Sequence, residues 1–212
     1  MFQDKYWYLL VLLTMFGIVI LHEFGHALAC RSVGGKANTI VLWPLGGIAI
    51  VQPPPRPGAM LWSIAAGPLV NVVLLPILWI IYFTAAPDHT TMELRGQADW
   101  QQYLLVVAVV NTGLLVFNML PLYPLDGGQM VQSILWFFVG RVKSLKIAAV
   151  LGLVGAIVLG ILMLRFADIY MAIMALFIGM EAWNGLRIAK YLEHMESSGY
   201  ATGTAEVPFG QR

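Results

Sequence analysis

A His-Glu-x-x-His motif, which spans His22 to His26, lies inside an apolar run that is long enough to cross a membrane. Two histidines four residues apart on a helix share one face, with a rise of about 6 Å between them. Both can bind one zinc ion while Glu23 reaches a water molecule on that ion. On insertion scales, an ionisable side chain near the centre of a membrane span costs about 2.5 to 3.5 kcal/mol. The position of the motif therefore predicts a functional site.

The rest of the chain has the composition of a multi-pass membrane protein. It has 212 residues, of which 59% are hydrophobic and 11% charged, and its mean hydropathy is +0.79. We predict one membrane-embedded domain at 1–190 and a flexible tail at 191–212. The net charge of +1 gives no sign of nucleic-acid binding, and the single Cys30 excludes an internal disulfide and a Cys-only zinc site.

The apolar windows predict an all-α polytopic membrane protein with about five transmembrane helices, one short re-entrant or interfacial helix and a small β-hairpin-like loop. The β-like loop is expected at about 37–51, where two β-branched runs flank a Pro-Leu-Gly-Gly turn. The segment 131–139 is too short to span the membrane and is expected to form the short helix. The five spans are expected at about 6–30, 58–86, 101–120, 146–164 and 169–187.

The distribution of Lys and Arg predicts the orientation of these spans. Basic residues follow the first span, precede the fourth and follow the fifth, whereas the loop between the second and third spans is mostly acidic. By the positive-inside rule the basic segments are cytoplasmic, which places the N-terminus outside. The metal-binding motif and Asp126 then both lie near cytoplasmic ends of spans, at similar depth. The basic residues concerned are Arg31, Lys36, Arg56, Arg141, Lys143, Lys146, Arg187 and Lys190.

Asp126 is the candidate for a third metal ligand. A catalytic zinc usually has three protein ligands and one open position, and the two histidines supply only two. The residues around Asp126 include two prolines and two glycines, so we expect irregular backbone at membrane depth, which is tolerated where it is buried in protein or lines a wet cavity. The alternative is that Asp126 only caps a helix that begins at Gly127.

Three motifs in order give the chain a resemblance to the site-2 protease family of intramembrane zinc metalloproteases. The resemblance covers about residues 6 to 140. It implies that His22, His26 and Asp126 bind one zinc ion and that Glu23 is the catalytic base. The matching segments are His22-Glu23-Phe24-Gly25-His26, Gly67-Pro68-Leu69-Val70-Asn71, and Asn118-Met119-Leu120-Pro121 leading to Leu125-Asp126-Gly127.

The resemblance also implies substrate-binding residues. Asn71 is expected to face the site and to hold substrate or the developing oxyanion, although it could be only an interhelical hydrogen-bonding residue. Gly46 and Gly47 are expected to belong to a β-structured loop near the substrate path. The chain departs from the family pattern in several ways. The His motif lies on the first helix, whereas many members carry a spanning helix before it, and Tyr123 stands where proline is common. We also find no PDZ-like insert between the motifs and no nucleotide-binding regulatory pair of domains after Lys190.

The function that follows is an intramembrane zinc endopeptidase acting on transmembrane protein substrates, with its active site toward the cytoplasmic side of the membrane. Zinc lowers the pKa of its bound water toward about 7, and Glu23 accepts the proton. Because a substrate helix hides its peptide bonds, it must unwind locally, and residues 39–51 could capture the unwound stretch by strand addition. A membrane metal transporter and a catalytically inactive membrane-binding homologue are the alternatives, and ferrous iron is an alternative metal. The sequence predicts neither the substrate nor the oligomeric state.

Overall fold

The computed structural model describes residues 5–43, 46–85, 99–166 and 169–197. Within them the chain forms six helices and one two-stranded antiparallel sheet, which confirms the predicted fold class. The elements in chain order are α1 (Lys5–Ser32), β1 (Lys36–Trp43), β2 (Gly46–Gln52), α2 (Pro57–Ala85), α3 (Asp99–Asn118), α4 (Asp126–Val139), α5 (Arg141–Phe166) and α6 (Ile169–Ser197).

Five of these helices, α1, α2, α3, α5 and α6, are long and apolar enough to cross a membrane. Their outer faces expose many large apolar side chains, for example Leu13, Val73 and Ile157. Such a surface is unfavourable in water and fits a lipid surrounding. The predicted number of spans is therefore confirmed.

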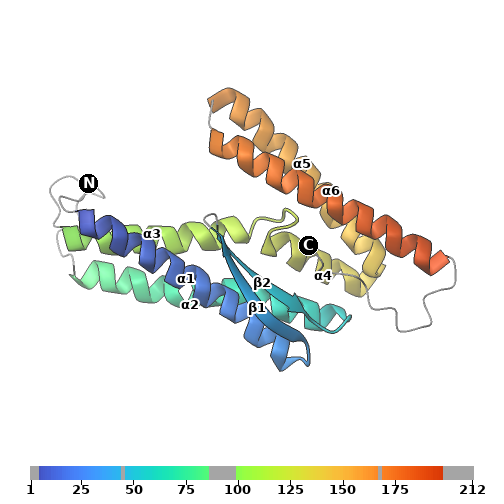
Figure 1. The fold of residues 1–212 in the computed structure, drawn as a ribbon, viewed down its shortest axis with the longest axis horizontal. Coiled ribbons are helices and arrows are strands. Elements are labelled where there is room, and N and C mark those ends of the chain that lie inside the picture. Colours follow the sequence, from blue (N-terminus) through green and yellow to red (C-terminus); the bar gives the residue numbers. More distant parts are fainter. Residues whose placement is uncertain (1–4, 44–45, 86–98, 167–168, 198–212) are drawn as a thin grey trace.

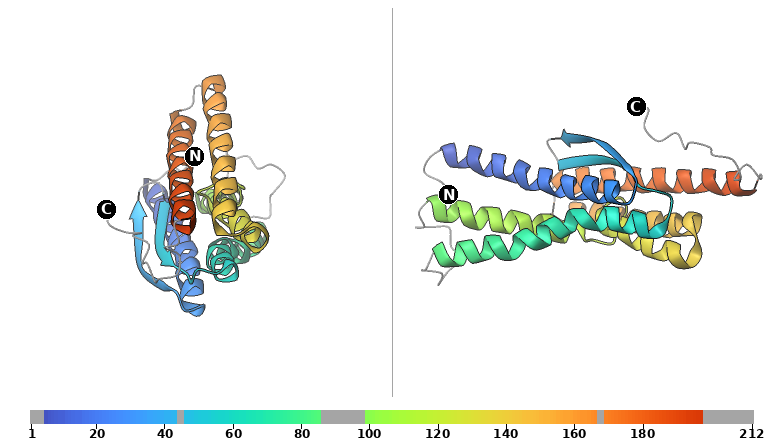
Figure 2. Two further views of the ribbon diagram at one scale, coloured as in Figure 1. Left: turned by 90° about the vertical axis from the view of Figure 1, so that its right-hand side faces the viewer. Right: turned by 90° about the horizontal axis from the view of Figure 1, so that it is seen from below.

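The helices fall into two groups that meet at α4 (Figure 1). Helix α1 packs on α2 and α3, and α2 also packs on α3 and α4. Helices α5 and α6 form a long hairpin in which they pack mainly on each other. Helix α5 also packs on α4. Figures 1 and 2 show this hairpin diverging from the bundle of α1, α2 and α3.

Strands β1 and β2 form the predicted hairpin, which lies along α1 (Figure 2). Thr39 pairs with Ile50, and the register shifts between Ala37 and Thr39, which indicates a β-bulge. The hairpin is tied to the end of α1, because the Arg31 guanidinium donates a hydrogen bond of 2.9 Å to the carbonyl oxygen of Ala37. Two residues after the end of α1, Gly34 has a φ of 84°, which a residue with a side chain rarely adopts. This backbone conformation is a common way to end a helix.

Three predicted boundaries are wrong. The short helix α4 begins at Asp126 and not at residue 131, because Gly127 and Gly128 serve close packing and do not terminate the helix. A Cβ atom on either glycine would come closer than 3.0 Å to backbone atoms of the preceding loop. Helix α5 begins at Arg141, directly after α4. Helix α6 continues through Ser197, so the predicted tail is helical at its start, and residues 198–212 lie outside the described part of the chain.

Candidate metal centre

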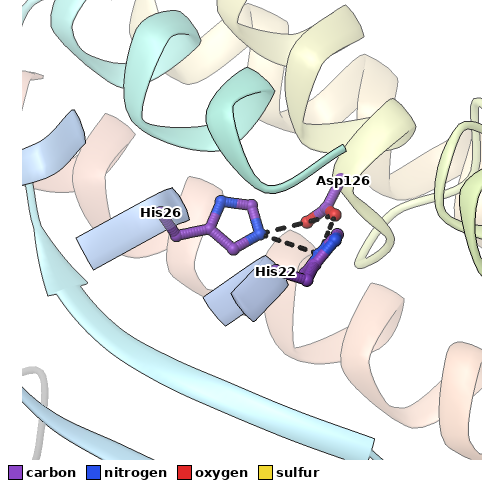
Figure 3. A group of neighbouring side chains, drawn as sticks. All are labelled: His22, His26 and Asp126. Carbon is purple, nitrogen blue, oxygen red and sulfur yellow. Dashed lines mark hydrogen bonds and ion pairs between the residues drawn. The ribbon is translucent and has the colours of Figure 1, made fainter. Parts of the chain in front are cut away.

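The structure brings together the side chains of His22, His26 and Asp126 (Figure 3). The two Nε2 atoms of the histidines lie 3.1 Å apart. The Oδ2 atom of Asp126 lies 3.1 Å from Nε2 of His22 and 3.5 Å from Nε2 of His26. Two ligand atoms that are each about 2.0–2.1 Å from a tetrahedral zinc ion lie about 3.3 Å apart. The three atoms are therefore spaced like three corners of a zinc coordination tetrahedron.

The hydrogen bonds of Asn71 determine which nitrogen of His22 carries a proton. The Nδ2 atom of Asn111 donates to the backbone oxygen of Asn71 at 3.1 Å, so the Oδ1 atom of Asn111 is left to accept from Nδ2 of Asn71 at 2.8 Å. Asn71 consequently presents its Oδ1 atom to Nδ1 of His22, at 2.6 Å. Because this oxygen can only accept, Nδ1 of His22 carries the proton and Nε2 keeps its lone pair for a metal.

His26 is oriented in the same way by a backbone carbonyl. Its Nδ1 atom donates to the carbonyl oxygen of Ser63 at 2.9 Å, which leaves the lone pair of its Nε2 atom facing Nε2 of His22 and the Asp126 carboxylate. Two imidazole lone pairs and a carboxylate oxygen thus face one another, an arrangement that repels unless a positive charge lies between them. A divalent cation satisfies all three groups at once, and a set of two imidazoles and one carboxylate suits zinc. The residues therefore fit a zinc ion.

Asp126 is the first residue of α4, which corrects the prediction that it lies in irregular backbone. The residue before it, Leu125, is in the N-cap position, and no side chain caps the helix. The alternative role for Asp126, as a helix cap, therefore does not describe this structure, because its side chain reaches the two histidines. The partial positive charge at the start of α4 favours a carboxylate there.

Two glycines allow α1 and α2 to approach closely enough to form this group. A Cβ atom on Gly25 would lie 2.5 Å from the carbonyl oxygen of Ala66. A Cβ atom on Gly67 would come closer than 3.0 Å to the ring of His26, so any side chain there would take the place of the imidazole. In the sequence Gly67 stood out only as the first residue of the Gly67–Asn71 segment that matches the family. Its role in making room for His26 is a tertiary contact that no local pattern encodes.

Glu23, the predicted base, lies next to His22 on α1 and only 7% of its surface is exposed. It stands between the two histidines on the same helix, one residue after His22 and three before His26. A buried carboxylate on the same helix as the two histidines is a candidate to exchange a proton with a group bound there. Its role stays a prediction.

The predicted substrate-binding residues fall into two different environments. Asn71 is fully buried, and both polar atoms of its side chain bind protein groups, which places it behind His22 as a positioning residue. A contact between Asn71 and substrate stays a prediction. Gly46 and Gly47 begin β2, in the hairpin that packs on α1, the helix that carries both histidines. Pro44 and Leu45 lie outside the described residues.

Sequence reasoning missed two groups that orient the ligands. The first is Asn111, whose polar side chain in an apolar helix was the available signal. It is fully buried and fixes the orientation of Asn71. The carbonyl of Ser63 binds His26 through the backbone, so no side-chain pattern could have indicated it.

Comparisons with known proteins agree with this geometry. The sequence model described as peptidase family M50 matches residues 10–162. A zinc metalloprotease of Methanocaldococcus jannaschii is 30% identical over 185 residues, which cover 87% of this chain and 51% of that protein. A putative zinc metalloprotease of Synechocystis is 31% identical over 200 residues, which cover 89% of this chain and 50% of that protein. The chain thus spans about half the length of these curated relatives.

A solved structure shows the same fold. The site-2 protease from Methanocaldococcus jannaschii superposes with a TM-score of 0.62 at 26% sequence identity, over 95% of this chain and 82% of that chain. The resemblance that the sequence motifs indicated is therefore confirmed.

Proposed function

This chain belongs to peptidase family M50, and from that premise we propose that it is an intramembrane zinc endopeptidase that hydrolyses peptide bonds in transmembrane protein substrates. The observation that carries the proposal is the metal centre: the lone pairs of His22 and His26 and the carboxylate of Asp126 converge among helices long enough to span a membrane. A binding protein without catalysis would not need a buried Glu23 beside such a group.

The residues around the site would have three roles in catalysis: binding the metal, orienting its ligands and transferring a proton. A zinc ion at this site would supply a Lewis acid that polarises the substrate carbonyl and acidifies water. His22, His26 and Asp126 would hold the ion, and the bonds from Asn71 and Ser63 keep the two imidazoles in the required tautomer. Glu23 would take a proton from the attacking water and pass it to the nitrogen of the leaving group.

We also propose that the β1–β2 hairpin receives the unwound part of the substrate. Among the described residues, β1 and β2 pair only with each other, so each has an edge without a strand partner. An unwound substrate in a membrane needs partners for its backbone amides and carbonyls, and an added strand obtains them from such an edge. Gly46 and Gly47 would lie along this path.

Replacing Ile48 or Ile50 with proline tests the hairpin. Both residues are paired with β1, and proline removes a backbone donor and disfavours the extended pairing. We expect the cleavage rate to fall by about tenfold or more, as expected for the loss of one or two backbone hydrogen bonds, while zinc content is unchanged. Ile50→Val, which keeps the backbone donor and the β-branched shape, is the matched control. Normal cleavage by the proline variants would show that the hairpin only packs at the membrane surface.

We further propose that the metal centre lies toward the cytoplasmic side of the membrane. The end of α1, the start of α2, the start of α5 and the end of α6 lie at the same end of the molecule (Figure 1). These segments carry the basic residues, including Arg31, Arg56, Arg141 and Lys190, which the positive-inside rule places in the cytoplasm.

The proposed function is tested with the purified full chain in lipid vesicles. We expect one zinc ion per chain and cleavage of a single-span protein substrate, which stops when a chelator removes the metal and returns when zinc is restored. Mass spectrometry of the products should place the cut toward the cytoplasmic end of the substrate span. Transport of metal ions across the vesicle membrane without cleavage of any single-span substrate would favour the transporter alternative instead.

A further inference from the structure

The loop between α3 and α4, residues 119–125, connects the metal centre to the α5–α6 hairpin. It leads directly into the metal ligand Asp126 at the start of α4. Its residues Leu122 and Tyr123 pack against α5 and α6 at three glycines, Gly152, Gly155 and Gly185, which we call the glycine socket.

A Cβ atom at any glycine of the socket would lie 3.0 Å or less from the loop. A Cβ atom on Gly152 would come closer than 3.0 Å to the carbonyl oxygen of Tyr123, and one on Gly185 would lie 3.0 Å from Cε1 of the Tyr123 ring. A Cβ atom on Gly155 would lie 2.5 Å from the side chain of Leu122. The contact at Gly152 is the most restrictive, because a backbone oxygen cannot rotate away as the end of a leucine side chain can.

The opposite side of the loop is equally close to α4. A Cβ atom on Gly127 would come closer than 3.0 Å to the carbonyl oxygen of Met119, and one on Gly128 closer than 3.0 Å to the backbone nitrogen of Tyr123. The side chain of Gln129 in α4 also donates a hydrogen bond of 2.8 Å to the carbonyl oxygen of Pro124. The loop is therefore clamped between the start of α4 and the hairpin, and it has little freedom to move away from either.

The ring of Tyr123 extends the contact between the loop and the hairpin. It packs against a buried cluster of Val142, Leu145 and Ala189, which belong to α5 and α6. The same residue is the point at which the chain departs from the proline common in the resembling family. The loop of this chain thus has an aromatic anchor in the hairpin.

We propose that the glycine socket positions Asp126, so that α5 and α6 set the geometry of the metal centre without supplying any of its three described ligands. Binding sites need their groups held to within about 0.5 Å, and a displaced loop would carry the Asp126 carboxylate away from the two histidines. The inference rests on the proposed zinc centre. It assigns α5 and α6, which contribute none of the three candidate ligands, the role of holding the loop that leads into Asp126.

The substitution Gly152→Ala tests the inference, with Gly160→Ala as its control. Both changes add one methyl group to α5, but a Cβ atom on Gly160 would meet nothing within 4 Å. We expect Gly152→Ala to weaken zinc binding by about 10- to 100-fold, as changes in groups that orient metal ligands do, and Gly160→Ala to bind zinc like the wild type. Affinity is measured by chelator competition on the metal-free protein, together with thermal unfolding.

A second pair of variants covers the case in which Gly152→Ala fails to fold. Tyr123→Ala removes the ring that packs at Gly185 and adds no group, so we expect it to weaken zinc binding. We expect Tyr123→Phe, which keeps the ring, to retain the wild-type affinity. In α6, Gly185→Ala, whose new Cβ atom would lie 3.0 Å from the Tyr123 ring, should also weaken zinc binding, whereas Gly179→Ala, whose Cβ atom would lie 3.5 Å from Cβ of Ala156, should not.

A double-mutant cycle separates positioning of Asp126 from a general loss of stability. If the socket acts through Asp126, Gly152→Ala should cost no further zinc affinity in an Asp126→Ala background. Equal zinc affinity in Gly152→Ala, Tyr123→Ala and the wild type, even with lowered thermal stability, would overturn the inference. Absence of zinc binding in the wild type would instead overturn the proposed metal centre on which the inference rests.

Discussion

The Glu23→Gln variant is expected to retain its zinc and to lose proteolysis, with a fall in rate of about 10²- to 10⁴-fold, the usual contribution of a general acid–base group. Glutamine has nearly the same shape as glutamate, so the packing of α1 around the buried side chain is preserved. An amide cannot take up the proton of the attacking water. The atoms that would hold the metal belong to His22, His26 and Asp126 and are unchanged.

Zinc content and cleavage of a single-span substrate must be measured on the same preparation of this variant. Glu181→Gln is the matched control, because Glu181 is a partly buried carboxylate within the span α6 and does not belong to the metal-binding group. The control should cleave at the wild-type rate. A wild-type rate in Glu23→Gln, with zinc unchanged, would remove Glu23 from the mechanism.

The grouping of the three candidate metal ligands could be predicted from the sequence because these residues lie within or next to apolar spans. Histidine and carboxylate side chains are costly inside a membrane span, so their presence in an apolar run carries information that it would lack on a soluble helix. Helical spacing placed His22 and His26 on one face, and the charge pattern placed Asp126 at the same depth. The structure brings these three together as predicted.

The residue at which α4 begins could not be predicted from the sequence, because a tertiary contact determines it. Glycines at positions 127 and 128 are poor helix formers, so local propensity argues against a helix there. In the structure they are the residues that allow α4 to lie against the preceding loop. The same reason hid the role of Gly67, whose missing side chain leaves room for the ring of His26.

The position of the α5–α6 hairpin relative to the other helices could not be predicted from the sequence either. Small residues such as Ala148, Ala149 and Gly152 mark a face of α5 that suits contact with another helix, but they do not identify which helix lies against it. The sequence therefore predicted two spans but not their partners. The glycines of α5 that meet Leu122 and Tyr123 resemble Gly160 in the sequence, and only the three-dimensional contacts distinguish them.

The Asp126→Ala variant is expected to lose most of its zinc affinity. Alanine leaves the two Nε2 atoms of His22 and His26 as the remaining ligands of the group, although both rings stay oriented by Asn71 and Ser63. Removing a ligand should cost more than the roughly 10- to 100-fold that the loss of an outer hydrogen-bond partner costs. Asp126→Asn should be affected less, because its amide oxygen keeps the position of the carboxylate while the negative charge is lost. Chelator competition on metal-free protein measures both variants.

The control for Asp126→Ala is Ser133→Ala on the same helix. Ser133 is fully buried, and its hydroxyl donates to the carbonyl oxygen of Gln129 within α4, so its loss perturbs the helix without touching the metal group. Zinc affinity should be unchanged in that control. Full and tight zinc binding in Asp126→Ala would assign the third ligand elsewhere. We expect zinc affinity to be lowest in Asp126→Ala, intermediate in Asp126→Asn, and equal to the wild type in Ser133→Ala. This order would show that the site needs both the charge and the position of the Asp126 carboxylate.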